Sequence, residues 1–349
     1  MHTRWDVIGV FIISLFIAHG ITPFVRLLAL RFGFLDHPEY KKSHAHPTPL
    51  LGGVAIYIAF LSSMVFVMDI HQTAAGLFLG ATMLLLVGLV DDKFGMMPEL
   101  KLTAQILAAL VAFKFGLRVT TIDDYYLCMF FTVFWIVGIA NAINLLDNLN
   151  GLSSGISAIS SIFFCIIAFI GKDYLTATLA ASVAGASIGF LRHNFPRANI
   201  FMGDAGSLVL GFVLACLAIM GSWATEDITL SLSIPIVILA YPIFDTTLVT
   251  IIRIFEKRSI FQGGRDHSSH ILAYAGFRKK RAVLTIFGIC IVLGIAALAI
   301  KYCPIKIGVV VLLITTVGMA AFAARLLYLR SAMVRMKNAK DRKNTVGSQ

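Results

Sequence analysis

The stretch AGLFLGATMLLLVGLVDDK, residues 75–93, ends an almost wholly apolar run with two adjacent carboxylates, Asp91 and Asp92. The run before them carries no charge and is about the length that a helix needs to cross the hydrocarbon of a bilayer. A chain does not place two like charges at the rim of such a segment without a compensating cation or partner. The stretch therefore predicts a membrane-spanning helix with a polar site at its end.

The composition of the whole chain is that of a membrane protein. Of 349 residues, 58% are hydrophobic and 13% are charged, and the mean hydropathy is +0.88, whereas soluble domains carry about 25% charged residues. The formal net charge of +11 is explained by basic residues kept on the cytoplasmic side of a membrane rather than by nucleic-acid binding. We expect an all-α polytopic membrane protein with no nucleic-acid partner.

Eleven apolar segments divide the chain, each about the length of a membrane-spanning helix. Their limits are 7–30, 50–68, 75–90, 102–116, 126–143, 152–170, 174–191, 206–223, 229–252, 282–300 and 307–327. The first is too long for the apolar part of a signal peptide, so we interpret it as a retained span. We expect residues 1–328 to form one integral membrane catalytic domain and residues 329–349 a basic cytoplasmic tail.

Eleven spans place alternate loops on opposite sides of the membrane, and 23 of the 29 Lys and Arg residues then fall on one side. The positive-inside rule makes that side the cytoplasm, with the N-terminus outside and the C-terminus inside. All the long polar loops fall on the cytoplasmic side, at 36–51, 91–101, 141–151, 192–207 and 253–281. Chemistry confined to one face favours an enzyme over a transporter, which needs polar groups near the midplane.

The acidic pair can serve two partners. Neighbouring side chains of a helix point about 100° apart, so one of Asp91 and Asp92 can face a metal ion while the other faces a substrate. The alternative is a solvated helix end in which Lys93 is the counter-ion.

The third polar loop, 141–151, begins with a spaced polar set. Asn141, Asn144 and Asp147 recur every three residues and lie near one face of a helix. Such groups at the end of a span are costly unless they have partners. Interhelical hydrogen bonding by the asparagines is the alternative explanation.

The fourth polar loop ends in Gly203-Asp204-Ala205-Gly206-Ser207, just before an apolar segment. This order places Asp204 and free backbone N–H groups at a helix start. A simple helix cap by Asp204 or Ser207 is the alternative, although a cap requires neither both glycines nor the preceding Asn194.

The fifth polar loop is the most basic and contains Gly263-Gly264-Arg265-Asp266-His267-Ser268-Ser269-His270. Two histidines three residues apart in a basic, Gly-flanked loop suit phosphate binding or acid–base work. Zinc is a weaker explanation, since no Cys or third His accompanies the pair. Asp245 lies inside the ninth apolar segment, where we expect it to pair with a neighbouring helix.

Three acidic positions, Asp91 with Asp92, Asp147 and Asp204, thus meet basic and His-bearing loops at one membrane face. A few carboxylates together with substrate phosphates are the usual ligands of Mg²⁺, which spreads charge during phosphoryl transfer. These residues predict a site for a substrate that has both a lipid part and a phosphate part.

Five motifs occur in order between residues 41 and 272. They are Pro47-Thr48-Pro49-x-x-Gly52-Gly53, Val90-Asp91-Asp92, Asn144-x-x-Asp147-x-x-Asn150-Gly151, Phe201-Met202-Gly203-Asp204-x-Gly206-Ser207 and the histidine loop. Together they resemble the polyprenyl-phosphate N-acetylhexosamine-1-phosphate transferases, in the WecA/TagO-like branch of the MraY/WecA superfamily (glycosyltransferase 4). The resemblance covers nearly the whole chain, and the eleven spans of the WecA branch agree with the segment count.

The resemblance implies a reaction. Undecaprenyl phosphate attacks the sugar-linked phosphate of a UDP-N-acetylhexosamine, giving a polyprenyl-diphospho-sugar and UMP and initiating cell-envelope polysaccharide synthesis at the bacterial inner membrane. The implied cofactor is Mg²⁺, with Mn²⁺ as a substitute. UDP-GlcNAc is the default donor, and UDP-FucNAc, UDP-QuiNAc and UDP-GalNAc are alternatives. A homodimer is a further hypothesis.

The resemblance also implies roles for individual residues. Asp204 and Asp91 look like Mg²⁺ ligands, and Asp91, Asp92 and Asp147 look like catalytic groups, of which the first two deprotonate or orient the lipid phosphate. The implied substrate-binding residues are Asn144, Asn150, Asn194, Lys101, Arg265, His267 and His270. In this scheme Lys101 meets the lipid phosphate and the histidines meet the phosphates of the nucleotide sugar.

Two departures from the family pattern concern the donor. Asn150 stands where the family usually has a second Asp, near the nucleotide base. His267-Ser268-Ser269-His270 differs from the His-x-His-His of the WecA branch and from the three consecutive histidines of the MraY branch, which argues against a MurNAc-pentapeptide substrate. Two alternatives from other classes are a lipid-linked sugar transporter or flippase and an inactive structural protein. The scarcity of charged residues at mid-span opposes the first, and the retained acidic residues oppose the second.

Overall fold

The computed structural model describes residues 4–36, 47–65, 72–259, 264 and 266–346. These residues are mostly α-helical, as expected. The helices are α1 (Arg4–Phe32), α2 (Gly52–Leu61), the short 3-10 helix η1 (Ser62–Val65), α3 (Gln72–Phe94), α4 (Pro98–Lys114), α5 (Tyr125–Leu145), α6 (Leu152–Ile170), α7 (Tyr174–Asn194), α8 (Gly203–Met220), α9 (Ile228–Ile238), α10 (Ala240–Phe255), α11 (Ser268–Tyr274), α12 (Lys279–Tyr302) and α13 (Ile305–Val346). Two short strands, β1 (Leu35–Asp36) and β2 (Thr48–Pro49), form an antiparallel pair.

Eight helices of the described residues are long and apolar enough to span a membrane, or nine if α9 and α10 form one span. All eleven predicted segments fall mainly on helices, and residues 66–68 of the second lie outside the described residues. The segments at 50–68 and 102–116 fall on α2 with η1 and on α4, and α2 and α4 have only 10 and 17 residues. The multi-pass membrane class is confirmed, and the count of eleven crossings stays a prediction.

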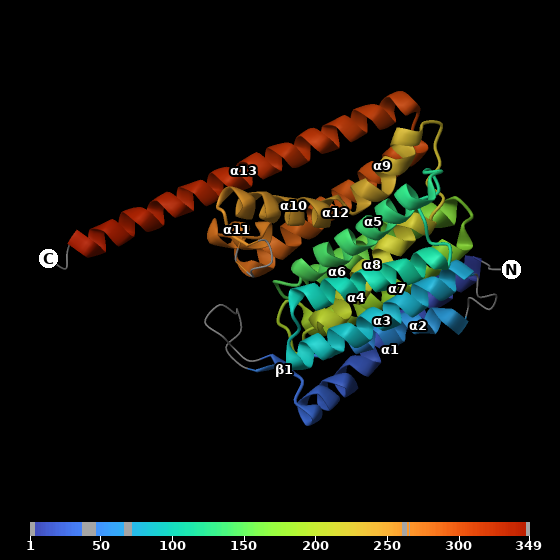
Figure 1. The fold of residues 1–349 in the computed structure, drawn as a ribbon, viewed down its shortest axis with the longest axis horizontal. Helices are drawn as coiled ribbons and strands as arrows, with labels where there is room; N and C mark the ends of the chain where they lie inside the picture. Colours follow the sequence, from blue (N-terminus) through green and yellow to red (C-terminus); the bar gives the residue numbers. More distant parts are fainter. Residues whose placement is uncertain (1–3, 37–46, 66–71, 260–263, 265, 347–349) are drawn as a thin grey trace.

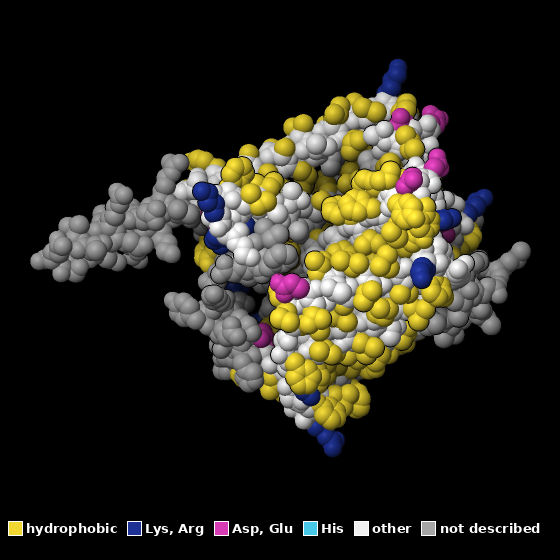
Figure 2. Space-filling view, viewed as in Figure 1, with side chains coloured by type: hydrophobic (Ala, Val, Ile, Leu, Met, Phe, Trp, Pro, Cys, Tyr) yellow, Lys and Arg dark blue, Asp and Glu magenta, His cyan; other side chains and the backbone are white. Residues whose placement is uncertain are grey.

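Helices α6, α7 and α8 form the centre of the bundle. In their apolar windows, 67%, 78% and 83% of the residues are buried, against 28% in α1 and 6% in α13. Accordingly, α1 and α13 lie at opposite outer edges in Figure 1. Hydrophobic side chains cover the middle of the face shown in Figure 2, and charged side chains lie toward its two ends. This distribution suits a bundle whose middle contacts lipid.

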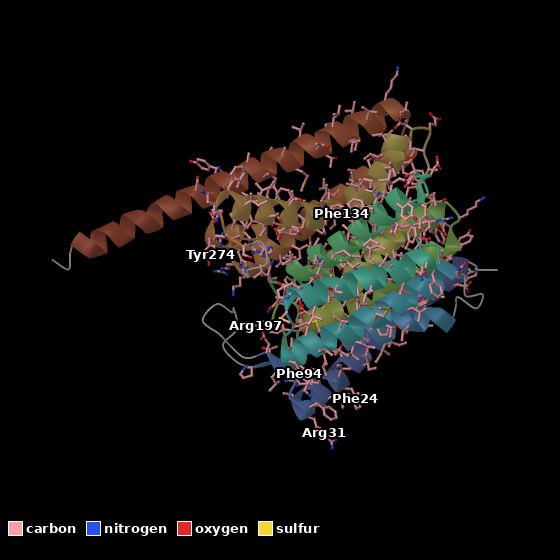
Figure 3. The ribbon with its side chains drawn as sticks, viewed as in Figure 1. Phe24, Arg31, Phe94, Phe134, Arg197 and Tyr274 are labelled. Carbon is pink, nitrogen blue, oxygen red and sulfur yellow. The ribbon has the colours of Figure 1, made fainter. Side chains whose placement is uncertain are left out.

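The ends of several helices meet at one end of the bundle. Figure 3 shows there Arg31 of α1, Phe94 of α3, Arg197 of the loop before α8, and Tyr274 of α11. The described residues that flank or belong to these predicted polar loops therefore lie toward a common end, at which α3 finishes and α8 begins.

The ninth predicted segment, 229–252, is not one straight span. It is divided into α9 and α10, which are bent by 76°. Pro242 has no backbone N–H to donate to the Ile238 carbonyl, and the Ser160 hydroxyl donates to that carbonyl instead, at 3.4 Å. A neighbouring side chain thus satisfies a backbone group that the broken helix leaves free, and the break turns α10 toward α11.

The start of α2 pairs with the segment before α8. The N–H groups of Gly52 and Gly53 donate to the carbonyls of Phe201 and Met202, both at 2.9 Å. A Cβ on Gly53 would lie 2.8 Å from the carbonyl carbon of Ala205 and closer still to Gly206. This close approach of the two backbones, which only glycine permits, braces the start of α8.

Candidate active site

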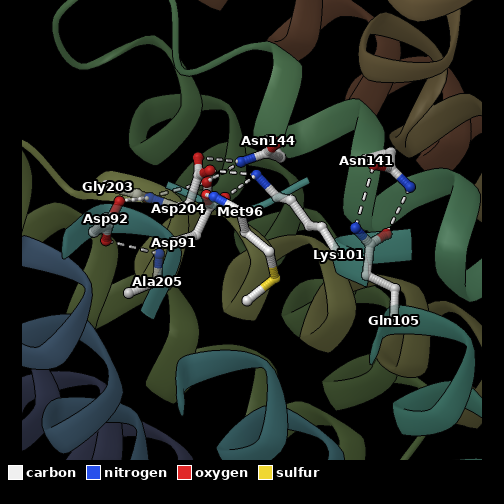
Figure 4. Close-up of polar contacts among 11 residues, drawn as sticks. Asp91, Asp92, Met96, Lys101, Gln105, Asn141, Asn144, Gly203, Asp204 and Ala205 are labelled. Carbon is white, nitrogen blue, oxygen red and sulfur yellow. Dashed lines mark hydrogen bonds and ion pairs between the residues drawn. The ribbon is translucent and has the colours of Figure 1, made fainter. Parts of the chain in front are cut away.

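Asp92 joins the end of α3 to the start of α8. Its Oδ1 accepts the N–H of Asp204 at 2.7 Å, and its Oδ2 accepts the N–H of Ala205 at 3.1 Å. These donors belong to the first turn of α8, where N–H groups lack partners within the helix. Gly203 has a φ of 73°, and a Cβ there would lie 2.8 Å from Asp92 Cγ. Glycine thus permits Asp92 to cap α8 and to fix Asp204 beside α3 (Figure 4).

Asp91 and Asp204 share one cation, the ammonium group of Lys101. Its Nζ lies 2.9 Å from Asp91 Oδ2 and also pairs with Asp204 Oδ2 (Figure 4). The chain reverses at Gly95, which has a φ of 71°, and Asp91 Oδ1 accepts the N–H of Met96 at 2.7 Å. The side chains of Asp91 and Lys101 are 12% and 16% exposed and that of Asp204 is 33% exposed. The trio therefore opens to solvent mainly at Asp204.

Asn144 holds the other oxygen of Asp204. Its Nδ2 donates to Asp204 Oδ1 at 2.7 Å and to Ser207 Oγ at 2.8 Å. With Lys101 on Oδ2 and Asn144 on Oδ1, the Asp204 carboxylate is fixed from two helices. Five predicted site residues thus meet at one place: Asp91, Asp92, Lys101, Asn144 and Asp204.

An amide pair lies beside this cluster. Of its two members, Asn141 was singled out from the sequence and Gln105 was not. Gln105 Nε2 donates to Asn141 Oδ1 at 3.3 Å, and Asn141 Nδ2 donates to Gln105 Oε1 at 2.6 Å (Figure 4). Gln105 is 1% exposed and follows Lys101 by one helical turn. The pair fixes α4 against α5 so that Lys101 reaches Asp204. A glutamine within an apolar segment was the available signal.

Asp147 lies in the loop between α5 and α6, where its N–H donates to the Asn144 carbonyl at 3.1 Å. Burial, followed by the negative charges of Asp204 and Asp92, raises the pKa of Asp147 to about 8. The charge effect places Asp147 within electrostatic reach of both carboxylates. A carboxyl with such a pKa keeps its proton at neutral pH and can donate a hydrogen bond.

Asn194 is a buried brace between two loops. It is 2% exposed, its Oδ1 accepts the N–H of Gly151 at 2.6 Å, and its Nδ2 donates to the Ile200 carbonyl at 2.8 Å. Backbone groups thus occupy both ends of the amide. The structure places Asn194 behind the site, and its predicted contact with substrate stays a prediction.

A cavity of about 100 Å³ opens next to this brace. It is lined by side chains that include Asn150, Phe195, Phe201, Lys279 and Lys280. Aromatic walls with one amide and two ammonium groups suit a flat ring and an anionic group. The two lysines, at the start of α12, were not among the predicted site residues.

The histidine loop leads into α11. His267 is 4% exposed, and its Nδ1 lies 2.7 Å from Asp245 Oδ2, so the predicted pairing of Asp245 is confirmed. The ring centroids of His267 and His270 are 6.4 Å apart. Ser269 Oγ donates to Asn148 Oδ1 at 2.7 Å, which ties α11 to the loop of Asp147. The predicted binding residue Arg265 lies outside the described residues.

Asp266 anchors the same loop through three guanidinium groups. Arg253, Arg258 and Arg330 lie 3.6, 3.0 and 3.3 Å from its carboxylate oxygens. Burial alone would raise the pKa of Asp266, but the hydrogen bond from Arg258 and the charges of the arginines lower it below its usual range. This cluster joins the histidine loop to the end of α10 and to α13.

The residues present fit a magnesium ion. The described part of the chain holds no group of three or more His, Cys, Asp or Glu side chains placed to bind a metal. Mg²⁺ needs fewer, because one or two carboxylates usually hold it together with water and substrate phosphates. Asp91 and Asp204 supply two carboxylates, and Lys101 between them shows that this place attracts positive charge. The predicted metal site stays a prediction.

The acidic cluster bridged by Lys101 thus lies where apolar helices end. Residues 74–222 match glycosyl transferase family 4. A probable undecaprenyl-phosphate N-acetylglucosaminyl 1-phosphate transferase of Bacillus subtilis (strain 168) is 34% identical over 330 residues, covering 91% of each chain. A decaprenyl-phosphate N-acetylglucosaminephosphotransferase of Mycolicibacterium smegmatis is 30% identical over 309 residues, covering 78% of this chain and 76% of the relative.

A phospho-N-acetylmuramoyl-pentapeptide-transferase of Bacillus velezensis is also 30% identical, over 321 residues that cover 83% of this chain and 95% of the relative. The chain belongs to glycosyl transferase family 4. It is an enzyme that transfers a phospho-sugar, so the predicted enzyme class is confirmed and the transporter or flippase alternative is not favoured.

Proposed function

We propose that this enzyme transfers N-acetylglucosamine 1-phosphate from UDP-GlcNAc to undecaprenyl phosphate. One observation carries the proposal: Lys101, paired with Asp91 and Asp204, lies at the end of apolar helices, where a lipid phosphate and a nucleotide diphosphate can meet. The name of the Bacillus subtilis relative supports the choice of lipid and sugar.

In this reaction an oxygen of the lipid phosphate forms a bond to the sugar-linked phosphorus of UDP-GlcNAc. The bond from that phosphorus to the bridging oxygen breaks, and UMP leaves with the electron pair. Both substrates are anions, so the site must supply positive charge. Lys101 supplies one cation. Mg²⁺ held by Asp91 and Asp204, with Mn²⁺ as a substitute, would further spread the charge of the phosphates.

The contacts support different roles for the two neighbouring carboxylates. Both oxygens of Asp92 accept backbone N–H groups of α8, so Asp92 acts by holding Asp204 in place. Within the described residues, Asp91 accepts only one backbone N–H, from Met96, and its Oδ2 pairs with the Lys101 ammonium. Because a lipid phosphate would meet the same ammonium, Asp91 is the carboxylate that orients or deprotonates it. Asp147, whose raised pKa keeps its proton at neutral pH, would donate a hydrogen bond to a phosphate oxygen.

The donor occupies the histidine side of the site. His267 and His270 bind its phosphates, and the nucleotide part enters the cavity lined by Asn150, Lys279 and Lys280. The enzyme lies in the bacterial inner membrane with its N-terminus outside and its active site and C-terminus in the cytoplasm. Protease protection of a C-terminal tag in right-side-out and inverted vesicles tests this orientation. A homodimer stays a prediction, which sedimentation in detergent checks.

The deciding experiment measures UMP release by the purified enzyme with undecaprenyl phosphate, Mg²⁺ and a panel of UDP-amino sugars. UDP-GlcNAc is expected to be the best donor, and UDP-MurNAc-pentapeptide is expected to be inert. Asp204→Asn is expected to abolish turnover, whereas Asp123→Asn, at an exposed carboxylate in the loop between α4 and α5, keeps it. No UMP from any donor would overturn the enzyme assignment, and a better donor than UDP-GlcNAc would overturn the choice of sugar.

A further inference from the structure

Asp245 is a fully buried carboxylate in the middle of a predicted span. It is 0% exposed and lies on α10, just past the bend from α9. A buried carboxylate is costly unless donors surround it. Its Oδ2 lies 2.7 Å from His267 Nδ1, and its Oδ1 accepts the Ser268 N–H at 2.8 Å and the Ser268 hydroxyl. All of its donors come from the first residues of the histidine loop helix.

Asp245, Ser268 and Tyr241 form a group that is buried away from solvent. Tyr241 and Ser268 are both 0% exposed, and their hydroxyl oxygens lie 2.6 Å apart. Tyr241 precedes Asp245 by one turn of α10, so the same helix face supports both partners of Ser268. The imidazole of His267 is therefore held by a rigid neighbour and not by a mobile side chain.

The contact decides which nitrogen of His267 is available. A carboxylate only accepts hydrogen bonds, so Nδ1 is assigned the N–H that faces Asp245. Within the part of the chain that the structure describes, Nε2 has no hydrogen-bond partner. A histidine held at Nδ1 presents Nε2 in a fixed direction, the arrangement by which outer partners orient metal-ligand and catalytic imidazoles.

A second tie fixes where this imidazole lies relative to the acidic cluster. Ser269 Oγ donates to Asn148 Oδ1 at 2.7 Å, and Asn148 follows Asp147 in the chain. The first turn of α11 is thus held from α10 by Asp245 and from the loop after α5 by Asn148.

We infer that Asp245 is a positioning residue that holds Nδ1 of His267 and so presents Nε2 to the diphosphate of the nucleotide sugar. The inference rests on the proposed function, since it requires a diphosphate donor at His267. The competing explanation is structural: Asp245 accepts the Ser268 N–H and could serve only to start α11. The two explanations differ in whether the effect of Asp245 depends on His267.

A double-mutant cycle separates them. Asp245→Asn keeps an oxygen for Ser268 but places an amide N–H against Nδ1. We expect kcat/KM for UDP-GlcNAc to fall about 10- to 100-fold, mostly through KM for the nucleotide sugar, with KM for undecaprenyl phosphate unchanged. In a His267→Ala background the same change is expected to lower kcat/KM by less than about 2-fold, because the imidazole through which Asp245 acts is absent. Thr250→Ala, on the same helix and bonded only to the backbone of α10, is the matched control.

Equal losses from Asp245→Asn in both backgrounds would overturn the inference, as would a loss confined to the lipid KM. If Asp245→Asn does not give a monodisperse, cooperatively unfolding protein, Asp245→Ser runs through the same cycle. If neither variant folds, Asp245 is a structural residue and the inference falls. A wild-type enzyme that releases no UMP from any donor would instead overturn the proposed function itself.

Discussion

A methyl group at Gly88 is expected to disable the site from within the membrane. Helices α3 and α8 touch at this glycine: a Cβ added there would lie 2.7 Å from the carbonyl carbon of Asp204 and closer still to Ala205. Ordinary contact begins at 3.4 Å, and backbone atoms cannot rotate away. The two helices must separate by roughly 1 Å, which costs about 1–3 kcal/mol of stability in a packed interior.

The separation acts on Asp92, which follows Gly88 by one helical turn. Its bonds to the N–H groups of Asp204 and Ala205 measure 2.7 and 3.1 Å, and an extra 1 Å takes both to or beyond the limit of a hydrogen bond. Asp204 then loses its fixed position beside Asp91. A misplacement of about 1 Å can cost 10²-fold in rate, so we expect Gly88→Ala to lower kcat about 100-fold.

UMP release and thermal unfolding in detergent measure the two effects. Gly288→Ala on α12 is the control, because a Cβ at that position would meet no neighbouring side chain or helix within 4 Å and alanine is the better helix former. Its activity and unfolding temperature are expected to match the wild type. A Gly88→Ala enzyme that turns over within about 3-fold of this control would refute the link between the α3–α8 contact and the geometry of Asp92.

Three further predictions concern the surroundings of the site. The pKa of Asp147 is about 8 in the folded protein and 3.8 in its ordinary state. Between these pH values the unfolded chain has lost the proton that the folded protein keeps, so the stability of the folded protein falls as pH rises. Thermal unfolding in EDTA should show a smaller fall of the unfolding temperature with pH for Asp147→Asn than for the wild type, and equal slopes would contradict the raised pKa. Arg330→Gln removes the ion pair from α13 to Asp266. We expect KM for UDP-GlcNAc to rise several-fold while kcat changes little. An unchanged KM would show that α13 does not steady the histidine loop. Gln105→Leu leaves the Asn141 amide oxygen without its partner and is expected to cost about 1–3 kcal/mol, measured by denaturant unfolding; an unchanged midpoint would show that the amide pair is not stabilising.

The acidic cluster was largely predictable because its members stand out locally. Carboxylates at the ends of apolar segments are improbable without partners, and the alternation of loops assigns Asp91, Asp147 and Asp204 to one side before any contact is known. Family resemblance then added the order of the motifs. The structure confirms that Asp91 and Asp204 meet, and the predicted catalytic, binding and metal roles stay to be measured.

The partner of each residue was less predictable, because a helical period gives the face of a residue but not the helix that it faces. Asp92 and Asp204 are 112 positions apart, and nothing local shows that one caps the helix of the other. The family resemblance implied that Asn194 binds substrate, yet backbone groups occupy both ends of its amide. The break between α9 and α10 was missed because both halves are apolar, although the prolines of that segment marked it.

The Lys101 ammonium has a consequence for the enzyme at rest. Two carboxylates as close as Asp91 and Asp204 would repel each other if both stayed charged in an empty site, and that repulsion would push α3 and α8 apart. The Lys101 side chain places a positive charge between the two carboxylates. The contact between α3 and α8 therefore does not depend on a dissolved cation. A chelator is therefore expected to stop turnover while leaving the unfolding temperature nearly unchanged, whereas Lys101→Met makes that temperature rise when Mg²⁺ is added. The proposed metal and substrates are therefore not needed to hold α3 and α8 together.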